Sequence, residues 1–444
     1  MGVPSASDPA ALIARPEFYQ DPYPTYAILR DEAPVFWYPP WGQWLVSRYD
    51  DIAHVLRHPE AFSSVGWEQR VLGQLDPALL ARITEIRDHY DTPALINSDP
   101  PEHVRLRRPV GRAFSPRNLE AMRPTVEELV GELLDGIGDA TETDLIEAFA
   151  YPLPALVIAG LMGVPAADRH LFTEWSADVV AFTGSFFPAD RAERAESSMR
   201  EFRAYLRGLI RERRAAPGAD LISQLLMVTD EAAALSDDEI VATAVVMLFA
   251  GHETTANLIG NGMLALFRNP VALERFRDDP DHAAAAIEEL LRYDSPVHRT
   301  RRVAKHDVEL GGQLIRAGQP ISNLLGAGNR DPRHFAEPDT LDLDRVDSAH
   351  LSFGHGIHYC VGAALSRLEA PDRVQRAAAA VSAHRPCIGR AAPLEAEPRV
   401  PRPRGASRPP RLGPARGASN GSAQASAVVS ADLVAVAISS TVSR

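Results

Sequence analysis

The sequence predicts a mainly α-helical fold with small β sheets. Residues 118–227 show the apolar spacing of successive amphipathic helices, interrupted by turn signals that contain glycine and proline. A longer helix of about 32 residues follows, because a capping box at residues 236–239 opens an apolar pattern without proline that lasts to Arg268. Strand signals are short, at residues 35–47 and 300–315.

Composition and length limit what this chain of 444 residues does. Its net charge of -13 argues against a general nucleic-acid binder. No apolar run approaches the roughly 18 residues of a membrane span, and residues 1–8 lack the basic and apolar regions of a signal peptide. Only Cys360 and Cys387 occur, which leaves no disulfide framework and fits a reducing compartment. We therefore expect a cytoplasmic protein without a nucleic-acid or membrane partner.

The first hundred residues mix helices with short strands. Residues 23–31 predict a helix, and strands at 35–38 and 43–47 flank a Pro-Pro-Trp-Gly turn, so a small sheet is expected. Residues 67–88 predict an amphipathic helix, and the polar run at 89–99 follows it.

The next predicted helix carries two basic side chains on one face. Asp99 is placed as its N-cap, with Pro100 and Pro101 in the first turn. His103 and Arg107 are four residues apart, so they share a helix face and can hold a single anionic group together. By itself, such a pair also suits a solvated surface.

The long helix contains a polar interruption. Residues 240–250 are apolar on most sides, which predicts burial, but the next positions are Gly251, His252, Glu253 and two threonines. The glycine costs about 1 kcal/mol relative to alanine, and a threonine hydroxyl can bond the carbonyl one turn back. Polar groups at this cost inside a buried helix indicate a function.

Residues 350–369 centre on Cys360. Gly354 and Gly356 permit a tight turn, and apolar residues at helical spacing follow, so the thiol lies where a loop becomes a helix. Helix N-termini stabilise thiolates, and a thiolate on iron favours O–O cleavage. Two alternatives are a zinc cluster with the nearby histidines and an ordinary buried thiol. A zinc site is disfavoured because no second cysteine lies near Cys360 in the sequence. An ordinary buried thiol is disfavoured by the fixed spacing of the residues in the loop.

Six positions of this loop carry a resemblance to a known family. They are Phe353, Gly354, Gly356, His358, Cys360 and Gly362, which match Phe-Gly-x-Gly-x-His-x-Cys-x-Gly. The stretch resembles the haem-binding loop of the cytochrome P-450 family. The resemblance implies one large helical domain over residues 1–370, with haem b (iron protoporphyrin IX) between the long helix and the loop. It also implies that Cys360 is the iron ligand.

The same resemblance implies roles for residues elsewhere. Cofactor contacts are expected from His103, Arg107, Ala250, Arg302, Phe353, Gly354, His358 and Gly362, with the propionates held by His103, Arg107 and Arg302. Thr254 is expected beside dioxygen and Glu253 in the path of protons, as the catalytic pair. Glu289, Arg292 and Arg345 match a buried ion network before the cysteine loop, and residues 182–188 match a substrate lid.

The implied activity is monooxygenation driven by NAD(P)H, by hydroxylation or epoxidation of a small apolar organic substrate. Electrons are expected from a ferredoxin and its reductase, because the chain has no flavin or iron–sulfur motif. A monomer is expected. Two alternatives stay open: a peroxygenase driven by hydrogen peroxide, and an inactive haem-binding remnant or sensor.

The resemblance fails in residues 371–444. Pro371 breaks the expected helix, and proline, arginine and glycine dominate residues 399–416, which is a disordered composition. The tail is either divergent or frame-shifted. Back-translation of residues 372–383 and 394–400 with GC-rich codons, read one base out of frame, yields segments similar to the family's last helix and strand. We therefore favour a shifted frame.

Overall fold

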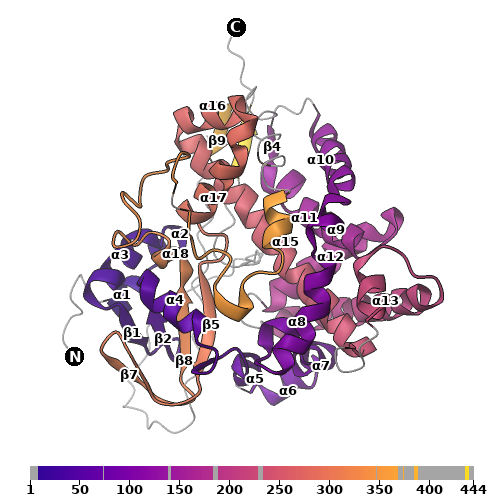
Figure 1. Cartoon of the computed structure of the whole chain (residues 1–444), viewed down its shortest axis with the longest axis horizontal. Coiled ribbons are helices and arrows are strands. Elements are labelled where there is room, and N and C mark those ends of the chain that lie inside the picture. The colour runs from indigo at the N-terminus through magenta and orange to yellow at the C-terminus, as the bar shows by residue number, and fades with distance from the viewer. Residues whose placement is uncertain are drawn as a thin grey trace, which may run out of the picture.

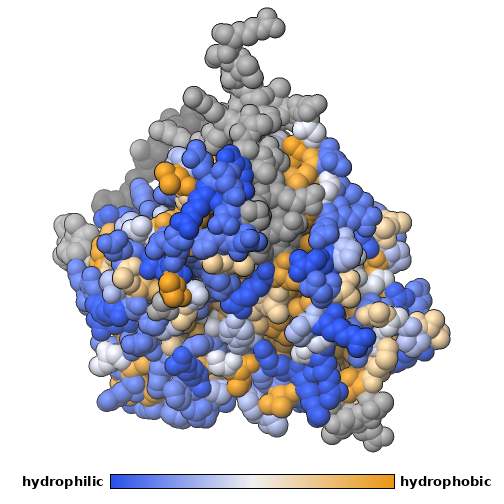
Figure 2. Space-filling model, turned by 45° about the horizontal axis from the view of Figure 1, so that its top comes forward, coloured by the Kyte–Doolittle hydropathy of each residue, from blue (hydrophilic) through white to orange (hydrophobic). Residues whose placement is uncertain are grey.

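A computed structural model describes the chain at residues 9–73, 75–138, 142–183, 189–228, 234–346, 348–368, 374, 385–388 and 436–439. The predicted helical fold with small sheets is confirmed, as Figure 1 shows. On the face in Figure 2, most described residues are hydrophilic. Within the described ranges, no helix has the length and apolar character needed to cross a membrane.

The largest sheet joins strands from distant parts of the chain. Its order is β1–β2–β8–β5–β3, in which β2 and β8 are parallel and the other neighbours are antiparallel. Strands predicted near residues 35, 43 and 300 are therefore confirmed. The bounds are β1 Val35–Tyr38, β2 Gln43–Val46, β3 Phe62–Ser63, β5 Arg299–Ala304 and β8 Pro320–Leu324. A hairpin joins β6 Val308–Leu310 to β7 Gln313–Ile315, and a second sheet has the order β4 Glu142–Asp144, β10 Val436–Ser439, β9 Arg385–Ile388.

Helices form two groups (Figure 1). With the large sheet lie α1 Pro9–Ile13, α2 Pro16–Gln20, α3 Tyr23–Glu32, α4 Tyr49–Arg57 and α18 Leu325–Gly328. The helical body contains α5 Trp67–Leu72, α6 Pro77–Leu80, α7 Thr84–Asp91, α8 Glu102–Ala113, α9 Pro116–Glu120, α10 Arg123–Ile137, α11 Pro152–Leu161, α12 Arg169–Thr183, α13 Ala192–Ala215, α14 Leu221–Leu226, α15 Asp237–Arg268, α16 Pro270–Asp278 and α17 Ala283–Tyr293. Short 3₁₀ turns lie at Leu95–Asn97, Ala166–Asp168, Ala189–Arg191, Pro280–His282 and Gly356–His358, and a π turn lies at Ile146–Ala150.

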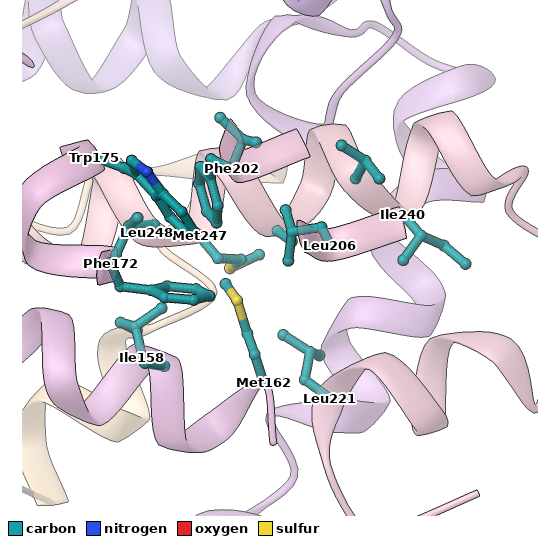
Figure 3. Packing of buried hydrophobic residues seen from close by; sticks show 14 of the residues in the cluster. Ile158, Met162, Phe172, Trp175, Phe202, Leu206, Leu221, Ile240, Met247 and Leu248 are labelled. Carbon is teal, nitrogen blue, oxygen red and sulfur yellow. The ribbon is translucent and has the colours of Figure 1, made fainter. Parts of the chain in front are cut away.

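The long helix α15 is confirmed, including its start. The Glu239 N–H donates to Ser236 Oγ at 3.2 Å, and the Ser236 N–H donates to Glu239 Oε2 at 2.8 Å, which is the predicted capping box. Figure 3 shows Met247 of α15 pointing toward Met162, beside Trp175 and Phe202. Trp175 and Phe202 stack with ring centroids 5.4 Å apart. Burial of each large apolar side chain contributes roughly 1.5–3 kcal/mol to the free energy of folding, so these contacts hold the helix firmly in place.

Two local expectations are wrong. Residues 67–88 form α5, α6 and α7 instead of one helix, and Asp76 caps α6 by accepting from the Ala78 N–H at 2.8 Å. Asp99 is not an N-cap, because α8 begins at Glu102 with Pro101 in the cap position. Its carboxylate instead accepts from Ser63 Oγ at 2.7 Å and lies 2.9 Å from Lys305 Nζ. At Asp99 tertiary partners override the local pattern, whereas the cap by Asp76 is itself a local signal for a new helix start.

Most of the atypical tail, residues 371–444, lies outside the described residues, as do residues 184–188 of the expected lid. The described parts of the tail are Val374, which is buried, and the strands β9 and β10.

A buried carboxylate holds the segment that leads to Cys360. Glu289 of α17 accepts from Arg292 Nε and Nη2 at 2.7 and 2.8 Å, and from Arg345 Nε at 3.0 Å. Arg292 also donates to the carbonyls of Asn329 and Pro338, at 3.0 and 2.8 Å. The predicted ion network is therefore present and ties α17 to two stretches of irregular chain.

Removal of this shared carboxylate should strongly destabilise the protein. Glu289→Ala leaves the fully buried Arg292 without its counter-charge, and we expect a loss of about 3–5 kcal/mol in the free energy of unfolding. Asp344→Ala, which breaks an exposed pair with Arg275, should cost no more than about 1 kcal/mol. Urea unfolding followed by circular dichroism checks both values. Equal losses in the two variants would contradict the structural role of Glu289.

Candidate active site

The cysteine loop depends on two glycines with positive φ. Gly354 and Gly356 both have φ of +68°, a conformation that side chains with a Cβ rarely adopt. A Cβ on Gly356 would lie 2.3 Å from the carbonyl oxygen of Leu56 in α4, so the loop requires glycine there. The Cys360 N–H then donates to the Phe353 carbonyl at 2.9 Å, and residues 363–368 are helical. The predicted change from loop to helix at Cys360 is confirmed.

Opposing forces act on the Cys360 thiol. The residue as a whole is exposed, but its sulfur is desolvated by the surrounding protein, which raises the pKa of the thiol. The N–H of Gly362, the charge of Arg107 and the N–H of Ala363 favour the thiolate, as expected at a helix start. Burial outweighs them, so the sequence-based expectation of a lowered pKa is wrong. A metal cation supplies the positive charge that such a thiol needs to ionise.

Among the described residues, no three or more His, Cys, Asp and Glu side chains are grouped so that they could hold a metal ion. The zinc alternative therefore has no geometric support in that part of the chain.

Basic and imidazole side chains gather beside the loop. His103 of α8 is 1% exposed, and neither of its ring nitrogens has a hydrogen-bond partner among the described residues. Its ring centroid lies 4.2 Å from that of His358. Arg107 Nη2 donates to the Tyr359 carbonyl at 2.5 Å, and Arg302 Nη1 donates to the Arg301 carbonyl at 2.6 Å. Side chains of α8 and β5 thus gather beside the cysteine loop, although these elements are far apart in the sequence.

The electrostatics of this cluster are unfavourable without an anion. Burial, followed by the charges of Arg302 and His103, lowers the pKa of His358 to about 3. Burial lowers the pKa of Arg302 to about 10, although Asp99 acts the other way. Burial and Arg107 also lower the pKa of His103. Orphaned nitrogens and crowded positive charge are the environment that an anionic group would relieve.

The polar residues that interrupt the apolar pattern of α15 lie in three different environments. Ala250 is exposed although residues 247 and 248 are buried, and the Thr254 hydroxyl donates to the Ala250 carbonyl at 2.6 Å. His252 is buried, with Nδ1 2.7 Å from Ser176 Oγ and Nε2 2.7 Å from the Tyr151 carbonyl. Burial lowers its pKa to about 4, so it is a neutral structural residue. Glu253 is half-buried on the same helix.

Sequence reasoning missed residues that position the cluster. Ser64 Oγ lies 3.0 Å from His358 Nε2, and its N–H donates to Asp99 Oδ1 at 3.0 Å. Tyr359 stands at a variable position of the loop pattern, so the pattern assigns it no role. No local signal marks Ser64, because its role depends on a partner 294 residues away.

Comparisons with known proteins agree on one family. The model described as Cytochrome P450 matches residues 166–371. Cytochrome P450 107B1 of Saccharopolyspora erythraea is 40% identical over 365 residues, which cover 81% of this chain and 87% of that protein. The chain belongs to the cytochrome P450 family. The Vitamin D(3) 25-hydroxylase of Pseudonocardia autotrophica is also 40% identical, over 79% of this chain and 84% of that protein.

Solved structures match this P450 over a similar length. Cytochrome P450 CYP109Q5 from Chondromyces apiculatus has a TM-score of 0.73 and 35% identity, over 82% of this chain and 89% of that chain. The family implies a haem cofactor, and the residues present fit one. A haem brings two carboxylates that suit the orphaned nitrogens of His103 and the charges of Arg107 and Arg302, and an iron that suits the Cys360 thiol.

Arg302→Met should separate anion binding from structural support. Loss of one charge-assisted hydrogen bond, about 1.5–3 kcal/mol, should weaken haem retention by roughly 10- to 100-fold. The haem-free protein should not be destabilised, because a poorly compensated buried charge is removed. Haem transfer to apomyoglobin and urea unfolding of the haem-free protein measure the two effects. Arg316→Met, at an exposed pair with Asp307, is the control, and a loss confined to haem-free stability would contradict the assignment.

Proposed function

We propose that this P450 carries haem b and inserts one oxygen atom of dioxygen into an apolar organic substrate, with electrons delivered by a ferredoxin and its reductase. The chain is a P450 monooxygenase, an enzyme class that acts on organic substrates and uses redox partners. The observation that carries the proposal is the cysteine loop at residues 353–362, which places a thiol beside buried basic side chains and the unpartnered ring nitrogens of His103. A 25-hydroxylase of vitamin D(3) among its relatives supports an apolar substrate.

We assign the cofactor contacts residue by residue. Cys360 would ligate the iron, and His103, Arg107, Arg302 and His358 would hold the haem carboxylates. Ala250, Phe353, Gly354 and Gly362 would line the cofactor, and the close approach of Gly356 to Leu56 sets the position of the loop. When bound, the haem supplies the iron at which dioxygen is reduced and split.

Thr254 and Glu253 are the proposed catalytic residues. Monooxygenation consumes two protons for each oxygen atom that leaves as water, so protons must reach a buried site. The Thr254 hydroxyl gives its hydrogen to the Ala250 carbonyl, which leaves its oxygen lone pairs available to accept a hydrogen bond. Glu253, half-buried one residue earlier, is an acid that can refill the relay. His252 is excluded, because both ring nitrogens are engaged and its pKa is about 4.

A peroxygenase needs no relay that protonates dioxygen, so Thr254 and Glu253 favour the monooxygenase. The alternative of an inactive haem-binding remnant is supported by the atypical composition of the tail at residues 371–444. We propose a P450 domain at residues 1–370 followed by an atypical tail at 371–444, and the end of the family match, which spans residues 166–371, supports this boundary. We also propose a monomer that works in the cytoplasm, where NAD(P)H is available.

Thr254→Ala should uncouple electron consumption from product formation. The variant keeps its helix but lacks the hydroxyl, so haem and substrate binding should be retained while product per NADPH falls severalfold and released peroxide rises. Thr243→Ala, in the same helix, is the control. Turnover supplied with hydrogen peroxide in place of NADPH should not depend on residue 254. An unchanged ratio of product to NADPH would remove Thr254 from the mechanism.

A further inference from the structure

An arginine and a glutamate form a forked ion pair behind the cysteine loop. Arg367 lies on the helical stretch 363–368 that follows Cys360, and Glu288 lies on α17. Arg367 Nε and Nη2 each donate to a different oxygen of Glu288, both at 2.8 Å. The Arg367 side chain is 40% exposed and that of Glu288 is 18% exposed. Two parallel hydrogen bonds fix the orientation of the guanidinium as well as its position.

The same guanidinium contacts the residues that hold Cys360. Arg367 Nη1 donates to the Tyr359 hydroxyl at 2.9 Å, and Arg367 Cζ lies 4.7 Å from the centroid of the Phe353 ring. Tyr359 immediately precedes Cys360, and the Phe353 carbonyl accepts the Cys360 N–H. A positive charge is therefore anchored to the residue that precedes Cys360 and to the residue that accepts the Cys360 N–H.

Tyr359 is held from both ends. Arg107 of α8 binds its carbonyl, while Arg367 binds its hydroxyl. On the far side of the pair, His350 Nε2 lies 3.3 Å from Glu288 Oε2, and the His350 ring packs 5.6 Å from Phe353. Glu288, Arg367 and Tyr359 thus form a continuous series of contacts from α17 to the loop, so rotation of one side chain would disturb the other two.

The charges of Glu288 and Arg367 both act on the cysteine. Burial opposes ionisation of Glu288, but its interactions with His350 and Arg367 outweigh burial and lower its pKa to about 2. The carboxylate is therefore negative at any working pH. Arg367 contacts Tyr359, the residue before Cys360, and the ring of Phe353, so its charge lies close to the sulfur-bearing residue. The field at the sulfur then depends on how far Glu288 neutralises Arg367.

We propose that Arg367 is a positioning residue whose charge, balanced by Glu288, sets the ease with which the iron held by Cys360 is reduced. This inference rests on the proposed ligation of iron by Cys360. Reduction adds one electron, so a more positive surrounding favours the reduced form and a more negative one favours the oxidised form. The two partners must therefore act in opposite directions, which a purely structural ion pair does not require.

The experiment is a redox titration of the full-length haem protein. Glu288→Gln leaves Arg367 unbalanced and should raise the reduction potential, whereas Arg367→Gln leaves Glu288 unbalanced and should lower it. The double variant should return close to the wild-type value. A tenfold change in the ratio of oxidised to reduced protein corresponds to 59 mV for one electron, and we expect a fraction of that shift in each single variant.

A matched control and conservative variants complete the design. Glu120 and Arg123 of the α9–α10 region form a similar forked pair, at 2.7 and 3.1 Å, and Arg123 is 42% exposed. Glu120→Gln and Arg123→Gln should leave the potential unchanged. Arg367→Lys keeps the charge and should keep most of the potential even if it weakens the fork. If Arg367→Gln fails to hold haem, Arg367→Lys still tests whether the potential depends on the charge at this position.

Shifts of the same sign in both single variants, or no shift in either, would overturn the inference while the reduced carbon-monoxide spectrum still shows a thiolate ligand. Loss of that thiolate band in the wild-type protein would instead overturn the proposed ligation itself. The two failures are therefore distinguishable.

Discussion

A buried cluster of arginine and histidine side chains, compensated only in part by Asp99, is the constraint on which the site depends. His103 and Arg107 come from α8, Arg302 comes from β5 and His358 comes from the cysteine loop, yet they gather beside Cys360. Each loses hydration on folding, and burial lowers the pKa of all four. A bound dianionic cofactor would restore the missing interactions, and binding only to the folded state would add directly to stability.

The ion network around Glu289 shows the opposite design. Arg292 is as deeply buried as any residue of the chain, but a carboxylate and backbone carbonyls satisfy its guanidinium. Its neighbour Glu288 completes a second pair with Arg367, which contacts the cysteine loop. Arg292 and Arg367 are therefore compensated by carboxylates in direct contact. Arg107 and Arg302, which face the proposed cofactor, instead donate to backbone carbonyls, and Asp99 acts on Arg302 from a longer range. This contrast distinguishes supporting residues from binding residues.

Local patterns in the sequence predicted what is local in the structure. The capping box of α15, its apolar pattern without proline and the glycines of the cysteine loop act within a few residues, and all were predicted correctly. Asp99 has a local pattern typical of an N-cap, but Ser63 and Lys305 hold its carboxylate instead. The direction of the Cys360 pKa could not be predicted, because burial is set by distant segments. Contacts between distant segments also define the roles of Ser64, Tyr359 and the ion pair of Glu288 with Arg367, so local patterns gave no sign of them.

The most direct test of the account is X-ray absorption at the iron edge of the purified ferric protein. The account predicts one sulfur atom in the coordination shell of the iron, because Cys360 supplies a thiolate. That sulfur should be absent from Cys360→Ser protein reconstituted with haem, since the only other cysteine is Cys387. Nitrogen and oxygen neighbours alone in the wild-type protein, or a sulfur neighbour that survives in the serine variant, would contradict the central role of Cys360.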